Sequence, residues 1–219
     1  DEVYGDLRVT TTAGFGTRWL APRLPRLFDS HPNLSLQLIL TEKVLDLPMR
    51  EADVAIRLSA PQQADLIRRK LMQVVMKLYV SRGYLERHGA PASLAELAEH
   101  RLIAYSPDAP QPSESADWIR SRIGPQRNAH VMMNSYFGVA KAAQSGLGVA
   151  ALPDYITREN PDLVNILPDE ASPPIPVYFT YPEELRRSQR VLAFRDFILS
   201  ELDAFARGAE EPVALAADA

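Results

Sequence analysis

The segment from residue 134 to residue 153 limits the possible fold more than any other stretch, because it carries a helix start, a helix stop and a buried strand in immediate succession. Asn134 and Ser135 follow an apolar run and are residue types that cap a helix by accepting its free amide hydrogens. Gly146 and Gly148 are spaced to end that helix in the left-handed conformation, and apolar residues then lead to Pro153. This order predicts a strand, a helix and a second strand.

The two glycines and Ala151 also form the pattern G-x-G-x-x-A, which is the spacing of a dinucleotide-binding turn. Such a turn follows a strand and opens a helix, so that its amides face a pyrophosphate. Here the glycines end a helix and open a strand, so we expect no dinucleotide, and the sequence predicts no other cofactor. An anion would instead meet the free amides at the helix start beside Asn134 and Ser135.

Further strands and helices alternate along the chain. Apolar runs predict strands over residues 7–11, 34–40, 52–56, 102–105, 163–167 and 175–181. Helices are expected between them, with a new helix start at Pro22, a short helix over residues 44–50, a capping-box helix over 93–100 and an amphipathic helix over 191–205. This alternation is typical of an α/β protein.

The repeating order of strands and helices predicts two Rossmann-like lobes joined by two crossover strands. The chain is expected to leave the first lobe near Val80 and to return to it near Thr180. We therefore assign residues 1–80 and 182–208 to lobe I, residues 81–181 to lobe II, and residues 209–219 to a disordered tail.

Composition excludes several classes of protein and site. A formal charge of −4 argues against nucleic-acid binding by this chain alone. The absence of cysteine excludes disulfides, thiol nucleophiles and thiolate metal sites. Because the sequence lacks the apolar window of about 18 residues that a membrane helix needs, we expect no membrane contact and a cytoplasmic location. The chain begins with Asp1, so we interpret it as a fragment or a processed form.

Side chains that could perform catalysis do not form a recognisable site in the sequence. The histidines His31, His88, His100 and His130 are far apart and lack the spacing of a zinc site. The G-x-S-x-G pattern of serine hydrolases is absent, and Ser145 precedes a helix stop instead of following a strand. We therefore predict no metal site and no catalytic residues, and we expect that the chain is not an enzyme.

Four stretches carry a family resemblance that spans nearly the whole chain. They are Leu-Ala-Pro-Arg-Leu-Pro-Arg-Leu-Phe at 20–28 with His31-Pro32, Ala-Asp-Val-Ala-Ile-Arg at 52–57, Tyr-Leu-Glu-Arg-His-Gly at 84–89 with Leu97 and His100-Arg101, and Gly-Leu-Gly-Val-Ala-Ala-Leu-Pro at 146–153. In this order they resemble the effector-binding domain of LysR-type transcriptional regulators. The resemblance is to the branch that is also similar to glycine-cleavage activators.

The resemblance implies a fold like that of type 2 periplasmic binding proteins, with a small-molecule effector held in a cleft between the lobes. It also implies that a winged helix-turn-helix and a linker helix precede this chain, so that DNA is bound only through that N-terminal domain. Proteins of this family pair lobe I of one chain with lobe II of its partner, which here implies an antiparallel homodimer through helices at 22–29 and 136–145. The full-length protein could also form a tetramer.

Ligands of doubly wound α/β lobes sit outside the carboxyl ends of the strands, near helix starts. The polar residues at these strand ends are the candidate effector ligands: Thr11, Thr12, Thr41, Arg57, Tyr105, Asn134, Ser135 and Thr180. In the resembled family the effector contacts fall on the same strand ends. Because hydroxyls, helix starts and an arginine suit a carboxylate, we expect an anionic effector bound between Thr12 and Ser135.

Two other functions are consistent with the same pattern. A solute-binding protein of a transporter would share the fold, and it would carry a secretory or lipoprotein signal ahead of Asp1. An enzyme on this fold, such as a dehydratase or a porphyrin-building deaminase, would need a nucleophile or a metal site, and the sequence predicts neither.

Overall fold

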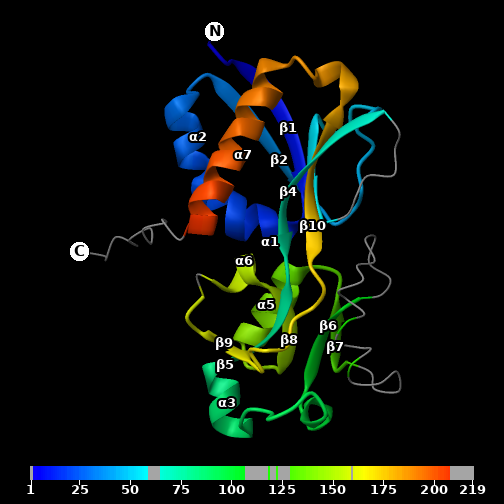
Figure 1. Ribbon diagram of the computed structural model, residues 1–219, viewed down its shortest axis with the longest axis vertical. Helices are drawn as coiled ribbons and strands as arrows, with labels where there is room; N and C mark the ends of the chain where they lie inside the picture. The colour runs from blue at the N-terminus through cyan, green and yellow to red at the C-terminus, as the bar shows by residue number, and fades with distance from the viewer. Residues whose placement is uncertain are drawn as a thin grey trace, which may run out of the picture.

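A computed structural model of the protein describes residues 2–58, 65–106, 118, 122, 129–158 and 160–207. Figure 1 shows two lobes stacked along the long axis, with two long strands running between them. Each lobe contains one mixed five-stranded sheet with helices packed against it, which confirms the predicted α/β class with two lobes. Within the described residues, every helix is too short or too polar to cross a bilayer.

The sheet of lobe I has the strand order β2-β1-β3-β10-β4. Its strands are β1 (Gly5–Thr11), β2 (Leu34–Leu40), β3 (Val54–Arg57), β4 (Leu66–Val74) and β10 (Ile175–Pro182). Strand β1 is parallel to β2 and β3, and β10 is antiparallel to both β3 and β4. The carboxyl ends of the three parallel strands therefore meet at one edge, which faces lobe II in Figure 1.

The sheet of lobe II has the strand order β7-β6-β8-β5-β9. Its strands are β5 (Met76–Ser81), β6 (Leu102–Tyr105), β7 (Val131–Met133), β8 (Val149–Pro153) and β9 (Leu163–Ile166). Its helices are α3 (Arg82–His88), the 3-10 turn Glu96–Glu99, α5 (Tyr136–Gln144) and α6 (Asp154–Thr157). Strand β6 is parallel to β7 and β8, so the end of β6 lies beside the loop that leads into α5.

The chain passes between the two sheets from β4 to β5 and again from β9 to β10. Both passages come earlier in the chain than the crossings expected near Val80 and Thr180, because β5 already belongs to the second sheet and all of β10 to the first. The two passages are tied together, since the Ser172 amide donates to the Met76 carbonyl and the Met76 amide donates to the Ser172 hydroxyl, both at 2.9 Å. The predicted tail, 209–219, lies outside the described residues.

The helical stretch after β1 is continuous, whereas the sequence predicted a new helix start at Pro22. It comprises α1 (Ala13–Phe15), a π-helical turn (Gly16–Leu20), a 3-10 turn (Ala21–Arg23) and α2 (Leu24–Ser30). Prolines are accommodated because Pro22 and Pro25 each occupy the first turn of their segment, where a missing N–H costs little.

The short helix predicted over residues 44–50 is wrong. The Met49 amide donates to the Asp46 carboxylate at 3.0 Å, and the Asp46 amide donates to the Glu51 carboxylate at 2.6 Å. Side-chain acceptors of this kind compete with helical hydrogen bonds and favour turns. The capping-box helix is likewise only a 3-10 turn, although the Glu96 amide does donate to the Ser93 hydroxyl at 3.4 Å.

The unit formed by β7, α5 and β8 confirms the strand–helix–strand order predicted for the central segment. Gly146 has φ +80°, as the predicted left-handed stop requires. Gly148 is different, because it does not have a positive φ. A Cβ atom at Gly148 would instead lie 2.2 Å from the Arg101 carbonyl oxygen, so this position requires glycine for close backbone approach.

One cluster of buried apolar side chains runs through both lobes. In lobe I it is covered by the C-terminal helix α7 (Gln189–Arg207), which buries Val191, Phe194, Ile198 and Leu202. The lobes meet where α1 and the π-helical turn pack against α5 and α6. There Phe15 lies edge to face with Tyr155, with ring centroids 5.5 Å apart, and both side chains are buried. The lobes therefore share a core on this side.

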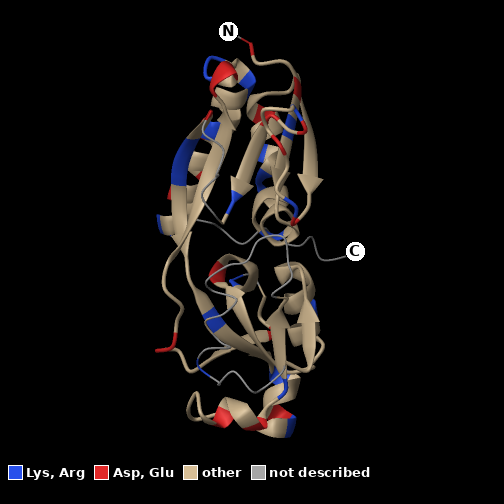
Figure 2. Ribbon diagram, turned by 90° about the vertical axis from the view of Figure 1, so that its right-hand side faces the viewer, with Lys and Arg blue, Asp and Glu red and all other residues tan. Residues whose placement is uncertain are grey.

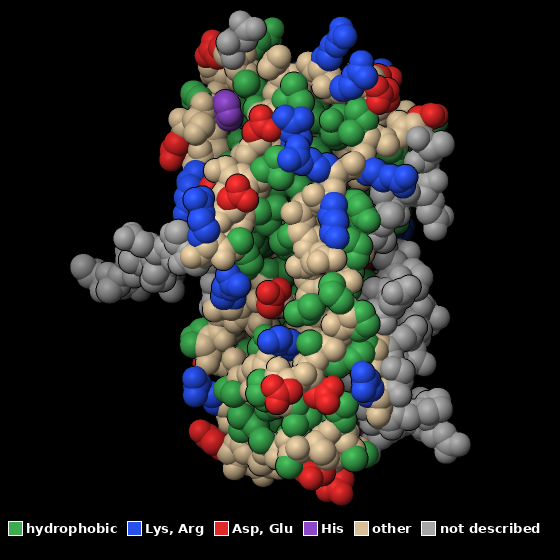
Figure 3. Space-filling view, viewed as in Figure 1, with side chains coloured by type: hydrophobic (Ala, Val, Ile, Leu, Met, Phe, Trp, Pro, Cys, Tyr) green, Lys and Arg blue, Asp and Glu red, His purple; other side chains and the backbone are tan. Residues whose placement is uncertain are grey.

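The outer surface carries charges of both signs. Figure 3 shows basic and acidic side chains interspersed over the face that carries α2 and α7. Figure 2 shows basic residues along β4, an edge strand of the lobe I sheet, where Arg68, Arg69 and Lys70 are consecutive and exposed. Positive charge on an edge strand opposes pairing with a strand of another chain.

Candidate functional site

The polar strand ends of lobe I face the start of α5 in lobe II across the junction between the lobes. The Glu42 carboxylate, just after β2, accepts a hydrogen bond from the Ala13 amide at 3.1 Å and is also hydrogen-bonded to the Ser135 side chain. Arg57 at the end of β3 and Tyr105 at the end of β6 interact electrostatically with this carboxylate. This junction is the candidate functional site.

Arg57 is buried and points inward, where it holds the loop that follows β2. Its guanidinium donates to the Thr41 carbonyl at 2.6 Å, to the Lys43 carbonyl at 2.8 Å and to the Thr10 hydroxyl at 2.7 Å. Burial lowers the pKa of Arg57 to about 10, and the nearby Glu42 partly offsets that shift. Arg57 is therefore still charged at neutral pH.

The predicted threonines Thr11, Thr12 and Thr41 use their hydroxyls within the protein, and Thr12 does so in part across the junction. Thr11 is fully buried and its hydroxyl donates to the Ile56 carbonyl at 3.0 Å. Thr12 caps α1, since its hydroxyl accepts from the Phe15 amide at 3.4 Å, and its side chain is also hydrogen-bonded to Tyr155. The Thr41 hydroxyl accepts from the Lys43 amide at 3.1 Å. These residues shape the site, and their contact with an effector stays a prediction.

Tyr105 forms an aromatic wall of the site in lobe II. Its ring stacks on that of Tyr136, with centroids 4.4 Å apart and planes inclined by 14°. Burial, followed by the Glu42 charge, raises the pKa of the Tyr105 phenol well above its usual value. Burial likewise raises the pKa of Tyr155 at the same junction. Both phenols are therefore neutral, and a neutral phenol can donate a hydrogen bond to an acceptor on a ligand.

The remaining three predicted residues differ in their position. The Ser135 side chain makes no capping bond to its own helix and instead reaches Glu42, so it faces the site. Asn134 is exposed. Thr180 pairs with Ala55 within the lobe I sheet, two residues before the carboxyl end of β3, so the sheet register sets it back from the site.

Glu42 is the site residue that sequence reasoning missed. Its signal was its place in the chain, directly after Thr41 at the carboxyl end of β2, where the parallel topology gathers the other polar residues. Burial raises the pKa of the Glu42 carboxyl group, while the Ala13 amide, the Arg57 charge and the Ser135 side chain oppose that rise. A half-buried carboxylate at the centre of a polar junction is typical of a functional site.

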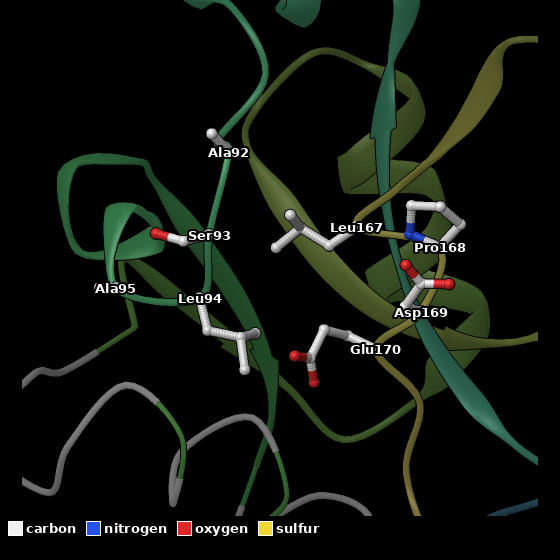
Figure 4. Close-up of a pocket in the computed structure, with 8 residues that line it drawn as sticks. All are labelled: Ala92, Ser93, Leu94, Ala95, Leu167, Pro168, Asp169 and Glu170. Carbon is white, nitrogen blue, oxygen red and sulfur yellow. The ribbon is translucent and has the colours of Figure 1, made fainter.

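A separate open pocket of about 610 Å³ lies in lobe II, away from the junction. Figure 4 shows it between the segment Ala92–Ala95 and the segment Leu167–Glu170, with the Leu94 and Leu167 side chains on opposite walls. None of the predicted ligand residues lines it. Within the described part of the chain, no group of three or more His, Asp or Glu side chains is placed to hold a metal ion.

The chain is similar to bacterial transcriptional regulators. It is 29% identical over 185 residues to an uncharacterised HTH-type transcriptional regulator of Haemophilus influenzae, a match that covers 81% of this chain and 63% of that protein. It is 25% identical over 205 residues to the HTH-type transcriptional regulator CrgA of Neisseria meningitidis, which covers 90% of this chain and 67% of CrgA. The chain thus corresponds to only part of the length of these relatives.

Solved structures of regulatory domains share the two-lobe fold. The regulatory domain of CrgA, a LysR-type regulator of Neisseria meningitidis, superposes with a TM-score of 0.78 at 23% identity, covering 91% of this chain and 99% of that one. The effector domain of AmpR of Pseudomonas aeruginosa gives a TM-score of 0.75 at 21% identity, covering 94% of this chain and 100% of that one.

A family model described as the LysR substrate binding domain matches residues 1–203. This match confirms the resemblance to LysR-type regulators and does not favour a transporter's solute-binding protein. The placement in the glycine-cleavage-activator branch stays a prediction. The chain belongs to the LysR substrate binding domain family.

Proposed function

We propose that this chain is the ligand-sensing part of a bacterial LysR-type transcription factor, and that it binds a small effector between its lobes without converting it. The observation that carries the proposal is the junction itself, where Glu42, Arg57, Tyr105 and Ser135 meet from four separate elements. DNA binding then belongs to a further domain, and the greater length of the similar HTH-type regulator of Haemophilus influenzae is consistent with one. A protein that acts on DNA in this way works in the cytoplasm.

An anionic effector suits the junction best. The Ala13 amide and the Ser135 side chain already hold a carboxylate, that of Glu42, so their geometry is compatible with an acid group. Arg57 adds a positive charge nearby. Tyr105 and Tyr136 offer an aromatic surface for the body of the ligand. Thr12 and Asn134 lie next to these groups along the chain.

Screening by thermal shift tests the proposal. A panel of metabolites that includes each acid beside its neutral amide is added to the domain, and at least one acid is expected to raise the melting temperature. The same titration on Ser135→Ala should show weaker binding, because the acid loses the Ser135 hydroxyl as a hydrogen-bond donor. The fold should be unaffected, since Ser135 makes no side-chain capping bond in its own helix. Ser93→Ala removes a serine hydroxyl away from the junction, together with its bond from the Glu96 amide, and this control should bind as the wild type does.

Two results would contradict the proposal. The first is equal binding of acid and amide to the wild type and to Ser135→Ala, which would end the assignment of an anion at the junction. The second is consumption of the bound metabolite, followed by NMR over several hours, which would indicate an enzyme. Promoter DNA binding by the full-length protein, with and without the same acid, then tests the regulatory role.

We also propose an antiparallel homodimer in which lobe I of one chain meets lobe II of the other. Exposed apolar side chains in both lobes support this arrangement, since Phe28 on α2 and Met132 on β7 are 36% and 52% exposed. Such interfaces bury about 1,600 Å². Sedimentation at tens of micromolar is expected to show a dimer, and a monomer at all concentrations would contradict it. A tetramer of the full-length protein is a further expectation of this proposal.

A further inference from the structure

Glu42 joins the two lobes through its carboxylate. Its Oε1 atom accepts from the Ala13 amide of lobe I at 3.1 Å, and the carboxylate is hydrogen-bonded to the Ser135 side chain of lobe II. Both partners lie at the first turn of a helical segment, on opposite sides of the junction. The Ser135 hydroxyl accepts no capping bond from its own helix, and its proton can be donated only once, here to the Glu42 carboxylate.

The groups that face Glu42 come from several elements. Arg57 on β3 carries the positive charge that balances it, while Tyr105 on β6 and Tyr155 on α6 are neutral phenols whose own ionisation the Glu42 charge opposes. Tyr136 on α5 stacks on Tyr105. Lys43 follows Glu42 in the same loop and is exposed.

Arg57 has little capacity left for a ligand while Glu42 is in place. Three of its hydrogen bonds go to Thr10, Thr41 and Lys43 within lobe I, and its Nε atom is buried without a partner. Its remaining contribution is through-space charge, and Glu42 neutralises that charge. An incoming anion would therefore meet a position that Glu42 already fills and whose positive charge Glu42 already balances. Binding beside the ionised Glu42 would also be unfavourable, because two carboxylates close together cannot both stay ionised at low cost.

We infer that Glu42 is the specificity-determining residue of the junction, and that its carboxylate occupies the position that the anionic group of the effector takes on binding. This inference rests on the proposed function of the junction as the effector site. Binding is then an exchange: the effector's acid group accepts from the Ala13 amide and the Ser135 hydroxyl, and Glu42 either leaves toward solvent or takes up a proton. Affinity for anions should rise when Glu42 is neutral.

A purely structural role for Glu42 makes a different prediction. In that case the carboxylate only caps the Ala13 amide, and replacing it would alter stability without changing affinity for anions. Glu42→Gln separates the two roles, because glutamine keeps an oxygen that can accept from the Ala13 amide and loses the charge. Glu86→Gln, on the exposed side of α3 in lobe II, makes the same charge change far from the junction and serves as the control.

The experiment uses methanesulfonate, an anion that stays ionised across the pH range in which carboxyl groups titrate. Its binding is followed through the Ala13 amide resonance in ¹⁵N-labelled protein. Glu42→Gln is expected to bind methanesulfonate about tenfold or more tightly than the wild type, since a neutralised like charge is worth about one pKa unit or more. The Glu86→Gln control should match the wild type, and dimethyl sulfone, the neutral analogue, should show no such difference.

The pH dependence of the affinity for methanesulfonate provides a second measurement. The affinity of the wild-type protein should increase as the pH is lowered and Glu42 takes up a proton, whereas the affinity of Glu42→Gln should stay level. Equal affinities of the two proteins at pH 7.5, or an Ala13 resonance that moves in neither, would overturn the inference. So would methylammonium bound by the wild type and lost in Glu42→Gln, because Glu42 would then be the receptor for a cation.

These outcomes are separable from the failure of the proposed function. Methanesulfonate reports on the exchange at Ala13 whether or not the natural effector is known. If no metabolite of the panel binds, but Glu42→Gln still binds methanesulfonate about tenfold more tightly than the wild type, only the sensor proposal is contradicted. An acid that binds the wild type and Glu42→Gln equally would contradict the role of Glu42 alone.

Discussion

At the residue scale, Arg57 is the side chain on which the shape of the junction depends most. It is buried at 5% exposure and it holds two carbonyl oxygens of the loop after β2 together with a hydroxyl of β1. A guanidinium suits this task because its planar fork donates in several fixed directions, whereas an ammonium group is a single point charge. The position of Glu42 in this loop therefore follows from Arg57.

Replacing Arg57 should destabilise the protein. We expect Arg57→Ala to lower the free energy of unfolding by about 3 kcal/mol or more, because it leaves one buried and two partly buried acceptors without a donor. Arg57→Lys should recover only part of this loss. Urea denaturation measures the change, with the exposed Arg68→Ala as a control that should stay within about 0.5 kcal/mol of wild type. A loss of stability below about 1 kcal/mol for Arg57→Ala would show that the hydrogen bonds of its guanidinium are not needed to hold the loop after β2.

The pH dependence of stability should report the burial of Glu42. Because burial raises its pKa above the ordinary value of 4.5, the folded protein binds this proton more tightly than the unfolded chain does. The stability that this proton supplies is full below pH 4.5 and is lost as the pH rises through the folded pKa. The stability of wild type minus that of Glu42→Gln should therefore decrease from pH 4 to pH 8 in urea unfolding. An increase would mean that the pKa is lowered.

The candidate site was predictable from the sequence as far as topology determines it. Arg57, Tyr105 and Ser135 follow strands or open a helix, and parallel strands bring such positions to one edge. Glu42 was missed because the direction of a side chain after a strand depends on the loop, which here is set by hydrogen bonds from Arg57. Thr180 lies back from the junction because its place depends on the register between β10 and β3, which the sequence does not encode locally.

At the element scale, local sequence patterns predicted most helices and strands. They failed where contacts with residues outside the local pattern determine the conformation of the segment. The strand–helix–strand segment around α5 carries its own start and stop signals, and it forms as predicted. The passage from β4 to β5 has no such signal, because the apolar run continues through Val75 without a turn residue. Over residues 44–50 the predicted helix does not form, because Pro48 lies inside the segment and the Asp46 and Glu51 carboxylates stabilise turns there instead.

Two glycines provide a matched test of close backbone approach. Gly148→Ala should destabilise the protein by about 1 to 3 kcal/mol or more, because its Cβ would collide with the Arg101 carbonyl oxygen, a backbone atom that cannot rotate away. At Gly83 in α3 a Cβ meets nothing within 4 Å, so Gly83→Ala should be neutral or stabilising by up to about 1 kcal/mol. Thermal denaturation of both variants measures the two changes in stability. Equal changes would contradict the assignment of Gly148 as a position that requires glycine for close backbone approach.

At the scale of the whole molecule, the two lobes are expected to fold as one unit. Most of their buried apolar residues belong to one cluster that runs through both lobes, and Phe15 of lobe I is fully buried against Tyr155 of lobe II. The lobes are further joined on the same side, where Arg158 lies over the Phe205 ring at 3.8 Å and donates to the Phe205 carbonyl at 3.1 Å. If effector binding moves the lobes, the movement on this side of the molecule is therefore expected to be small.

Thermal unfolding should accordingly be one cooperative transition. We expect the calorimetric and van't Hoff enthalpies to agree, because neither lobe can keep its core when the other unfolds. Phe15→Ala should lower the stability by about 3 to 5 kcal/mol and keep the single transition. The tryptophan signal, which comes from Trp19 in lobe I and Trp118 in lobe II, should follow the same curve as the far-UV signal of the whole chain. Two resolved transitions would mean that the lobes are independent.

The pairing of the two connections has a mechanical consequence. Strands β4 and β10 are hydrogen-bonded neighbours from Ile175 and Val74 to Pro182 and Leu66, and Ser172 and Met76 continue the link at the crossing itself. Such a joint behaves as a two-stranded ribbon, which resists sliding and stretching in its plane and bends easily across it. In the proposed dimer, a signal from the junction can then reach the partner chain as a change in the bend of this joint, with its hydrogen bonds intact.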